Sequence, residues 1–352
     1  MAGSTAALRR TSLRVLGILS AAGIGFLAAE AVIRLFALAP HLEEQYQEFV
    51  STGTRPYARR PFSHVAGRNS TDEFDYDYRH NSLGFRGPEW SRPKPENVFR
   101  IVGLGDSFTY GVGVSLEETY LHRLETLLNQ RSGPHPRVEV INLGMPAYFP
   151  EPERMVLEQI GATFRPDLIL VGFLPNDVVD TYRTLGFVTV DRSGYLVTRD
   201  AARLGAVGAT LYRHCHVCRI ALRGYLSWKM ERGRSGGISG IWGPAGMHER
   251  DWLAIEREYG RMHRIADSIG STFVLMQIPQ RPPWSPEARY PGQRLIRWAT
   301  SRQVGFLDLL PVMEAAAGQR LYYPLDGHCT PAGHALIAEE LARYLTARGM
   351  IP

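Results

Sequence analysis

A serine lies where an apolar run gives way to small and polar residues. The run 101–104 is apolar and is followed by Gly105, Asp106 and Ser107. Such a transition places a serine hydroxyl on an exposed turn at a sheet edge. This hydroxyl is a poor nucleophile until a neighbouring base takes its proton. Near the C-terminus, the segment 326–328 (Asp-Gly-His) contains an imidazole that could act as that base.

Two further markers follow predicted strands. Gly144 comes directly after the predicted strand 138–143, and Asn176 follows the apolar run 167–173. The carboxyl ends of parallel strands meet at one edge of a sheet, where such folds bind their ligands. We therefore expect these two residues to lie near Ser107.

In this order, the residues resemble the SGNH hydrolase superfamily, also called the GDSL esterase/lipase superfamily. The matching blocks are Gly105-Asp106-Ser107-Phe108, Asn142-Leu143-Gly144, Gly172 to Asp177, and Asp326-Gly327-His328. The resemblance covers residues 99–183 and 270–348. Two blocks depart from the common pattern: G-x-N-D is stretched around Pro175, and D-x-x-H is shortened to D-x-H.

The resemblance implies a serine esterase mechanism without metal or cofactor. His328 would take the Ser107 proton, and Asp326 would orient the imidazole. The oxyanion donors would be the backbone N–H groups of Ser107 and Gly144 and the side-chain amide of Asn176.

Neighbouring polar residues are given structural roles. We interpret Asp106 as a turn residue and Asp177 as a cap of the segment that follows it. We expect His334 to pack or hydrogen-bond within the closing helix, and Cys329 to be a small packing residue.

The remaining two cysteines form one C-x-x-C motif, at Cys215 and Cys218. A single pair with an internal histidine is a weak zinc signal. Haem attachment would need a histidine directly after Cys218, where Arg219 stands. We expect a local disulfide or two free thiols, and no metal.

The elements that must position the site alternate between strand and helix. Apolar runs predict five strands: 99–104, 138–143, 167–173, 272–278 and 305–310. Helical spacing predicts four helices: 117–130, 152–161, 249–269 and 331–348. Repeated strand-helix units imply a parallel sheet covered on both faces. We predict an α/β fold with three layers (α/β/α) around a mainly parallel five-stranded sheet, the flavodoxin-like SGNH architecture.

The N-terminus predicts a membrane span. Residues 13–39 are mostly apolar, and 27 residues of helix reach about 40 Å, enough for a hydrocarbon core of about 30 Å. Glu30 and Arg34 are spaced to pair near the far interface. Arginines ahead of the span keep residues 1–12 in the cytoplasm. The catalytic domain would then be periplasmic, on the inner membrane; the alternative is secretion after cleavage of a signal peptide.

Two stretches flank or interrupt the predicted hydrolase domain, residues 98–350. Residues 40–97 form an N-terminal extension, in which 72–78 predicts an edge strand or an extended arm. The segment 81–87 either packs Phe85 on the core or forms a wall of the substrate entrance.

Residues 180–244 are interpreted as an insertion, acting as a cap over the site or as a surface near the membrane. A hairpin is predicted at 187–197, a basic helix at 209–229 and a loop at 231–240.

The composition and charge of the chain argue against one class of function, nucleic-acid binding. The chain has 352 residues, 44% of them hydrophobic, and a net charge of +5. Its basic residues are scattered and form no stripe with interleaved aromatics, which argues against nucleic-acid binding. The sequence does not indicate an oligomeric state.

The leading hypothesis is a serine esterase that hydrolyses acyl or acetyl esters of a glycan or lipid through an acyl-serine intermediate. One alternative is an O-acyltransferase or deacetylase acting on cell-envelope polysaccharide. The other is an anchored binding or assembly protein with an idle site.

Overall fold

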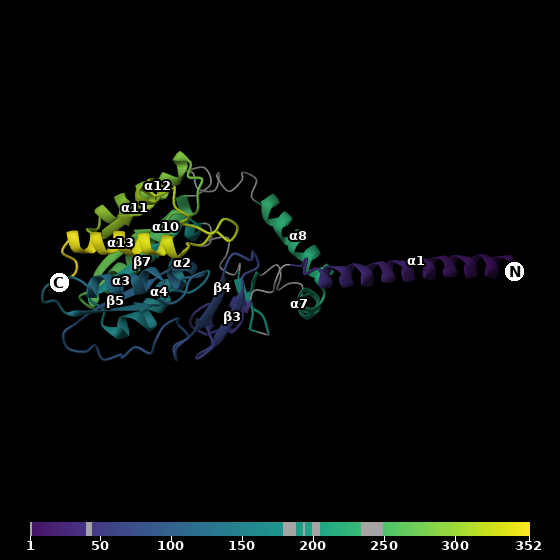
Figure 1. Cartoon of the computed structure of the whole chain (residues 1–352), viewed down its shortest axis with the longest axis horizontal. Coiled ribbons are helices and arrows are strands. Elements are labelled where there is room, and N and C mark those ends of the chain that lie inside the picture. Colours follow the sequence, from purple (N-terminus) through teal and green to yellow (C-terminus); the bar gives the residue numbers. More distant parts are fainter. Residues whose placement is uncertain (1, 40–43, 179–187, 193, 199–204, 234–248) are drawn as a thin grey trace. The chain divides into compact units, whose positions relative to one another are not determined.

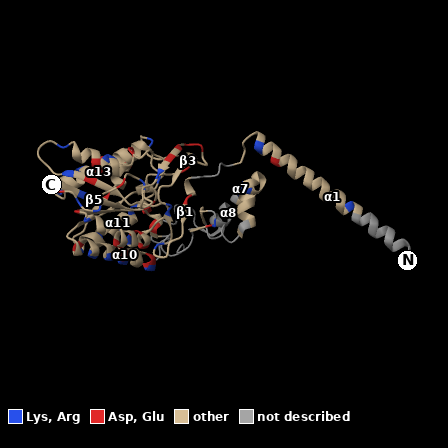
Figure 2. Cartoon of the chain, turned by 90° about the horizontal axis from the view of Figure 1, so that it is seen from below, with Lys and Arg blue, Asp and Glu red and all other residues tan. Residues whose placement is uncertain are grey.

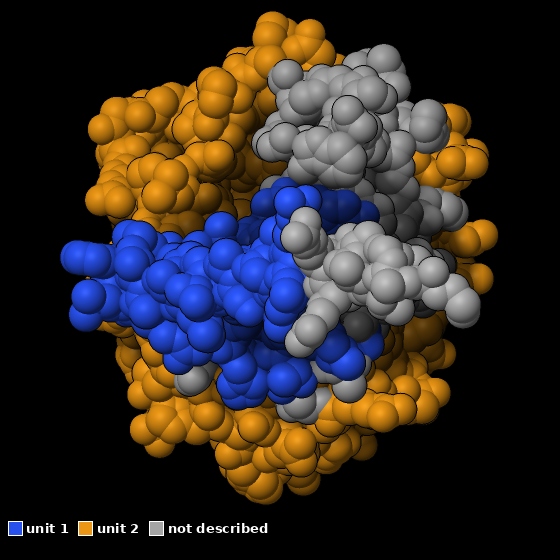
Figure 3. Space-filling view, turned by 90° about the vertical axis from the view of Figure 1, so that its right-hand side faces the viewer, with its two compact units in different colours: residues 1–42, 200–233 blue, residues 43–199, 234–352 orange. Residues whose placement is uncertain are grey.

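The computed structural model describes residues 2–39, 44–178, 188–192, 194–198, 205–233 and 249–352. Contacts divide the chain into two compact units (Figure 3). The first comprises residues 1–42 and 200–233, and the second comprises 43–199 and 234–352.

A five-stranded sheet forms the centre of the second unit (Figure 1). Its strands are β5 (Val98–Leu104), β6 (Arg137–Asn142), β7 (Leu168–Phe173), β10 (Thr272–Gln277) and β11 (Gly305–Asp308). They lie in the order β11-β10-β7-β5-β6, and every pairing is parallel. The predicted sheet is confirmed, and its strands begin and end within two residues of the predicted positions.

Helices cover both faces of this sheet. One face carries α3 (Tyr120–Asn129), α12 (Leu310–Ala315) and α13 (Pro331–Ala347); the other carries α4 (Pro150–Gln159), α10 (Glu249–Ser268) and α11 (Tyr290–Thr300). The short helices are α2 (Ser107–Tyr110), η2 (Gly161–Phe164) and η3 (Pro286–Arg289). Strand β7 shows why both faces are covered: Ile169 and Val171 enter one core, whereas Leu170 enters the other, and all three are fully buried. This is the predicted three-layer SGNH-type fold.

The N-terminal extension forms small antiparallel pairs outside the central sheet. Its elements are η1 (Glu44–Tyr46), β1 (Phe49–Val50) with β2 (Ala58–Arg59), and β3 (His64–Arg68) with β4 (Asp75–Arg79). The segment predicted as an edge strand therefore pairs only within its own hairpin. Phe85 is fully buried in the core, which confirms the packing interpretation of that loop.

The predicted insertion 180–244 is divided between the two units. The hairpin of β8 (Val188–Val190) and β9 (Leu196–Thr198) was predicted and belongs to the second unit. The single helix predicted at 209–229 is wrong: α7 (Gly205–His214) and α8 (His216–Gly233) are separate helices that meet at Cys215. Within the predicted loop 231–240, α8 continues to Gly233, and the remainder lies outside the described residues.

The first unit contains the long helix α1 (Ala2–Leu35). Its segment Leu13–Leu35 has 23 residues, a mean hydropathy of 2.0 and no residue buried within the protein, so it is long and apolar enough to cross a membrane. Figure 2 shows charged residues on the described part of this helix only towards its two ends. The predicted pair forms, with Arg34 Nε 2.8 Å from Glu30 Oε1.

Cys215 and Cys218 form a disulfide in the first unit. Of the two states expected for these cysteines, a local disulfide or two free thiols, the structure has the disulfide. Among the described residues, no group of three or more His, Cys, Asp or Glu side chains is arranged to hold a metal ion.

Candidate active site

The turn after β5 presents Ser107 at the first position of α2. Gly105 has φ of 153°, and a side chain there would lie 2.1 Å from Thr109 Oγ1, so only glycine fits. Asp106 caps the helix by accepting a hydrogen bond from the Phe108 N–H at 2.9 Å. The predicted turn role of Asp106 is thus observed as a helix cap.

Three predicted side chains form one chain of hydrogen bonds. Ser107 Oγ lies 2.8 Å from His328 Nε2, and His328 Nδ1 lies 2.5 Å from Asp326 Oδ1. The His328 and Asp326 side chains are only 15% and 11% exposed. The fold therefore brings together a hydroxyl and an imidazole that are 221 residues apart in sequence.

A tight turn lets the carboxylate of Asp326 reach the ring of His328, although the Asp-Gly-His spacing is shortened. The Gly327 N–H donates to the Tyr323 carbonyl at 3.0 Å, and the Tyr323 N–H donates to the His328 carbonyl at 2.9 Å. Gly327 has φ of 92°, in the region that favours glycine. The turn lets Asp326 Oδ1 accept from the His328 backbone N–H as well, at 3.2 Å.

The Asp326 carboxylate is held in its ionised form. Burial alone would raise its pKa, but hydrogen bonds from the side chain and backbone of His328, with the charge of that imidazole, outweigh burial and lower the pKa below its usual range. Asn69 Nδ2 adds a long contact of 3.5 Å to Asp326 Oδ2. Asp326 can therefore act as an anionic acceptor for the imidazole at neutral pH.

Gly144 is required by packing. Its N–H donates to Asn142 Oδ1 at 2.9 Å, within the protein. A side chain at Gly144 would lie 2.5 Å from the backbone nitrogen of Tyr110, in α2. The predicted oxyanion role of Gly144 therefore requires that its N–H be shared with, or released from, Asn142 Oδ1.

Asn176 stands at the start of a helical segment that follows β7. Its side chain hydrogen-bonds to Asp106, the residue before Ser107. Burial raises the pKa of Asp106 to about 6, against the lowering effects of the Phe108 N–H, the His328 charge and the Asn176 side chain. The prediction that Asn176 lies near the serine turn is consistent with this contact.

Asp177 was predicted to cap the segment after it, which from residue 179 lies outside the described residues. Asp177 Oδ2 accepts from the Leu174 N–H at 3.0 Å and so closes a turn. His334 is buried and accepts from the Tyr120 N–H at 3.2 Å, and burial lowers its pKa to about 3. Cys329 is fully buried in the core.

Residues 104–336 match the sequence profile of the GDSL-like Lipase/Acylhydrolase family. The chain belongs to this family. The assignment makes the protein a hydrolase that acts on ester bonds, as the sequence resemblance implied. No match to a curated protein was found.

Solved structures to which this chain is similar include TesA and two esterases. TesA is 15% identical, with a TM-score of 0.43, and the match covers 70% of this chain and 98% of TesA. An acetylxylan esterase variant from Geobacillus stearothermophilus, Axe2-D191A, is 14% identical, with a TM-score of 0.44 and coverage of 72% and 96%. The esterase EstA from Pseudoalteromonas sp. is 11% identical, with a TM-score of 0.40 and coverage of 71% and 97%.

In this GDSL-like hydrolase, Glu153 is a buried residue that the sequence analysis missed. It lies on α4 and is 1% exposed, and neither carboxyl oxygen has a hydrogen-bond partner within the described part of the chain. Burial and the nearby Asp106 raise its pKa well above the usual value. Its spacing from Val156 and Leu157 places it on the apolar face of the helix, which was the available signal.

Ala147 has an unusual backbone conformation that the sequence analysis did not predict. It has φ of 58°, an uncommon conformation for a residue other than glycine. The loop that carries it is tied to the serine turn, because the N–H of Met145 donates to the carbonyl of Gly105 at 3.0 Å. The sequence gives no signal for this backbone conformation.

Proposed function

We propose that this GDSL-like hydrolase is a serine esterase that cleaves carboxylic esters through an acyl intermediate on Ser107. The observation that carries the proposal is the chain of hydrogen bonds from Ser107 through His328 to Asp326. A serine, a base and an orienting carboxylate within hydrogen-bond reach are the arrangement that nucleophilic catalysis needs.

The geometry supports a two-step reaction. His328 Nε2 takes the Ser107 proton as the oxygen attacks the ester carbonyl, and it later gives that proton to the departing alcohol. Water then attacks the acyl group, and its proton passes through the same nitrogen. Ionised Asp326 accepts the Nδ1–H of His328, which fixes the tautomer and stabilises the imidazolium.

The tetrahedral intermediate needs donors for its negative oxygen. The Ser107 N–H belongs to the first turn of α2, where backbone donors have no partner inside the helix. The Asn176 amide, beside Asp106, is the second proposed donor. Gly144 is the third proposed donor, and its N–H must then turn from Asn142 Oδ1 to the oxyanion. Such donors each contribute roughly 10²- to 10³-fold in rate.

We propose that α1 anchors the enzyme in the inner membrane with its catalytic unit in the periplasm. The support is the apolar segment Leu13–Leu35 and the three arginines at 9, 10 and 14, which precede or begin it. The Cys215–Cys218 disulfide fits an oxidising compartment. Secretion after signal cleavage is the alternative, and the mass of the mature protein distinguishes the two.

Labelling with a fluorophosphonate probe tests the esterase proposal. The wild-type protein should be labelled on one serine and should turn over p-nitrophenyl acetate. Ser107→Ala should lose both properties, whereas Ser115→Ala, an exposed serine in the following loop, should keep both. A folded wild-type protein that is neither labelled nor active would overturn the proposal.

A further inference from the structure

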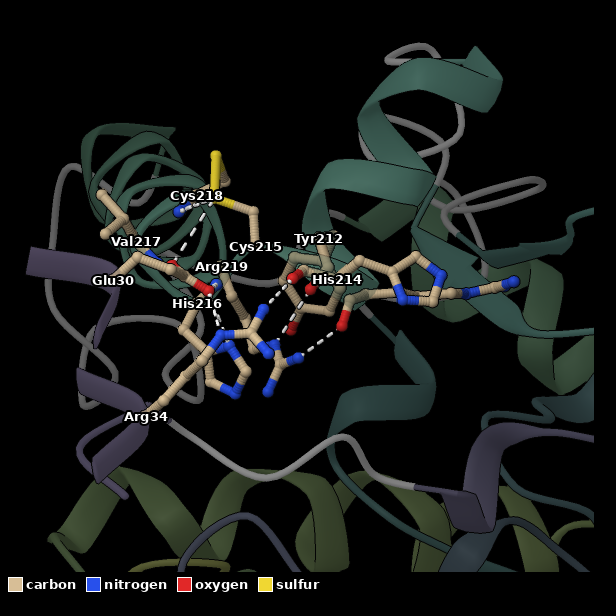
Figure 4. Close-up of a disulfide and its surroundings, with 10 residues drawn as sticks. Glu30, Arg34, Tyr212, His214, Cys215, His216, Val217, Cys218 and Arg219 are labelled. Atoms are coloured by element: carbon tan, nitrogen blue, oxygen red, sulfur yellow. Dashed lines mark hydrogen bonds and ion pairs between the residues drawn. A yellow bond between two sulfur atoms is a disulfide. The ribbon is translucent and has the colours of Figure 1, made fainter. Parts of the chain in front are cut away.

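The carboxylate of Glu30 in α1 binds the start of α8 (Figure 4). Glu30 Oε1 accepts from the backbone N–H of His216 at 3.0 Å, and Oε2 accepts from that of Val217 at 2.9 Å. The first N–H groups of a helix have no partner inside it and carry partial positive charge. A side chain on one helix therefore supplies the cap of another that is 186 residues away in sequence.

Further contacts fix this junction. His216 Nδ1 lies 3.0 Å from Glu30 Oε1, and Arg34 donates to the His214 carbonyl at 2.7 Å. The disulfide between Cys215 and Cys218 closes the first turn of α8, where the Cys218 N–H lies 3.1 Å from the Cys215 sulfur. Together, these contacts hold α8 against α1.

The position of Glu30 along the helix sets a depth for the junction. It lies five residues before the end of the apolar segment Leu13–Leu35, a rise of about 8 Å. A carboxylate within a bilayer is costly unless it has partners or reaches the interface. Because the start of α8 is bonded to that carboxylate, it must lie at the same level of the membrane.

The two helices expose apolar side chains. Val207, Leu211, Ile220 and Tyr225 are 72%, 43%, 40% and 52% exposed; we call these four residues the hairpin face. Val207 and Leu211 are four residues apart and share one side of α7. Residues 205–225 contain three arginines and no Asp or Glu, and one of the arginines, Arg219, is buried and donates to the Tyr212 and Arg213 carbonyls. Exposed apolar groups among basic residues are typical of helices that lie in the interface of an anionic membrane.

We propose that α7 and α8 lie in the membrane interface, with the hairpin face against lipid, and that Glu30 fastens them to the anchor helix. The lipid bilayer is the occupant because α1 exposes apolar side chains on both sides of Glu30, at Leu27 before it and at Val32 and Leu35 after it. The inference rests on the proposed membrane anchor. It gives this part of the predicted insertion a lipid-binding role and does not make it a cap over the active site.

Spin labels in the full-length protein test the depth. Single cysteines replace Leu211, Ile220 or Tyr225, and the protein is placed in nanodiscs of phosphatidylethanolamine and phosphatidylglycerol. The native cysteines do not interfere, since two form a disulfide and Cys329 is buried. We expect collisions with oxygen to exceed collisions with a nickel chelate several-fold at all three sites.

Two control labels separate the possible failures. A label at Ile24 reports on the anchor, and one at Leu253, exposed on α10 in the other unit, should be aqueous. If the label at Ile24 is immersed in lipid but the labels at all three hairpin sites are exposed to water, the inference about α7 and α8 is wrong and the proposed anchor stands. An aqueous value at Ile24 overturns the proposed anchor, and the inference falls with it, while the esterase proposal is unaffected.

Substitution of Glu30 tests whether this residue attaches α8 to α1. Glu30→Leu removes the acceptor and leaves the span more apolar, so membrane insertion is preserved. We expect the label at Ile220 to become more mobile and less immersed. The matched control Glu30→Gln keeps one acceptor oxygen and should retain most of the wild-type signal. Unchanged mobility and depth in Glu30→Leu would contradict the role of Glu30.

Discussion

The Glu73 carboxylate accepts a hydrogen bond from the backbone N–H of Asp326 at 2.6 Å, across 253 residues of sequence. It also accepts from the Leu325 N–H at 3.0 Å. Glu73 belongs to the turn between β3 and β4, so the N-terminal extension supports the loop that carries Asp326 and His328. This turn is thus part of the machinery that positions the proposed triad.

We predict that Glu73→Ala lowers kcat about 10- to 100-fold and changes KM little, because a small displacement of the loop misaligns His328 with Ser107. Glu73→Gln keeps an acceptor and should retain most of the activity. Asp77→Ala, at an exposed site in the same hairpin, is the matched control. Steady-state kinetics measure kcat and KM of variants whose thermal unfolding is unchanged. A wild-type kcat in Glu73→Ala would refute the positioning role of Glu73.

Replacing Asp326 by Asn should lower kcat about 10³- to 10⁴-fold, because a neutral amide does not stabilise the imidazolium and favours the wrong tautomer of His328. The fold should survive, because an amide oxygen can still accept from the His328 backbone N–H. Burst and steady-state kinetics with p-nitrophenyl acetate measure the effect. A loss below tenfold would mean that another group orients His328.

Substitution of Asn176 should impair catalysis, whereas substitution of Asn142 should impair stability. Asn176→Ala removes a proposed oxyanion donor and should lower kcat about 10²- to 10³-fold at nearly constant KM. Asn142→Ala should instead destabilise the fold, because it leaves the Gly144 N–H and the Thr109 carbonyl without their side-chain partner. Kinetics and thermal unfolding of both variants separate the roles. Full activity in Asn176→Ala would exclude it from the oxyanion site.

The sheet and the serine–histidine pair could be predicted because their signals are local. The run from Leu168 to Phe173 is apolar at every position except one glycine, and it is buried throughout, as a central parallel strand must be. Ser107, Asp326 and His328 each follow or precede a recognisable element, and sheet topology then brings them to one edge.

The misses depend on contacts between distant residues. Nothing in the sequence shows that the Asn142 side chain accepts from the Gly144 N–H. The support of Asp326 by Glu73 joins a surface turn to a loop near the C-terminus, and no periodicity encodes it. The break between α7 and α8 falls at Cys215, where residues on both sides favour helix and the cap comes from Glu30.

Glu153 predicts a distinctive dependence of stability on pH. Burial raises its folded-state pKa, so the folded protein keeps this proton at a pH where the unfolded chain has lost it. The associated stability is fully present below the unfolded-state pKa near 4.5 and falls as pH rises, by about tenfold in the unfolding constant per pH unit, until the folded-state pKa is passed.

Glu153→Gln removes this titration while nearly preserving shape. The difference in unfolding free energy between the variant and the wild type should therefore shift in favour of the variant from pH 4 to pH 7. Chemical denaturation at each pH unit measures it, and a constant offset from the unpaired amide does not alter the slope. Glu158→Gln, exposed on the same helix, is the matched control. A flat difference for Glu153→Gln would show that the folded protein holds no extra proton at this carboxyl.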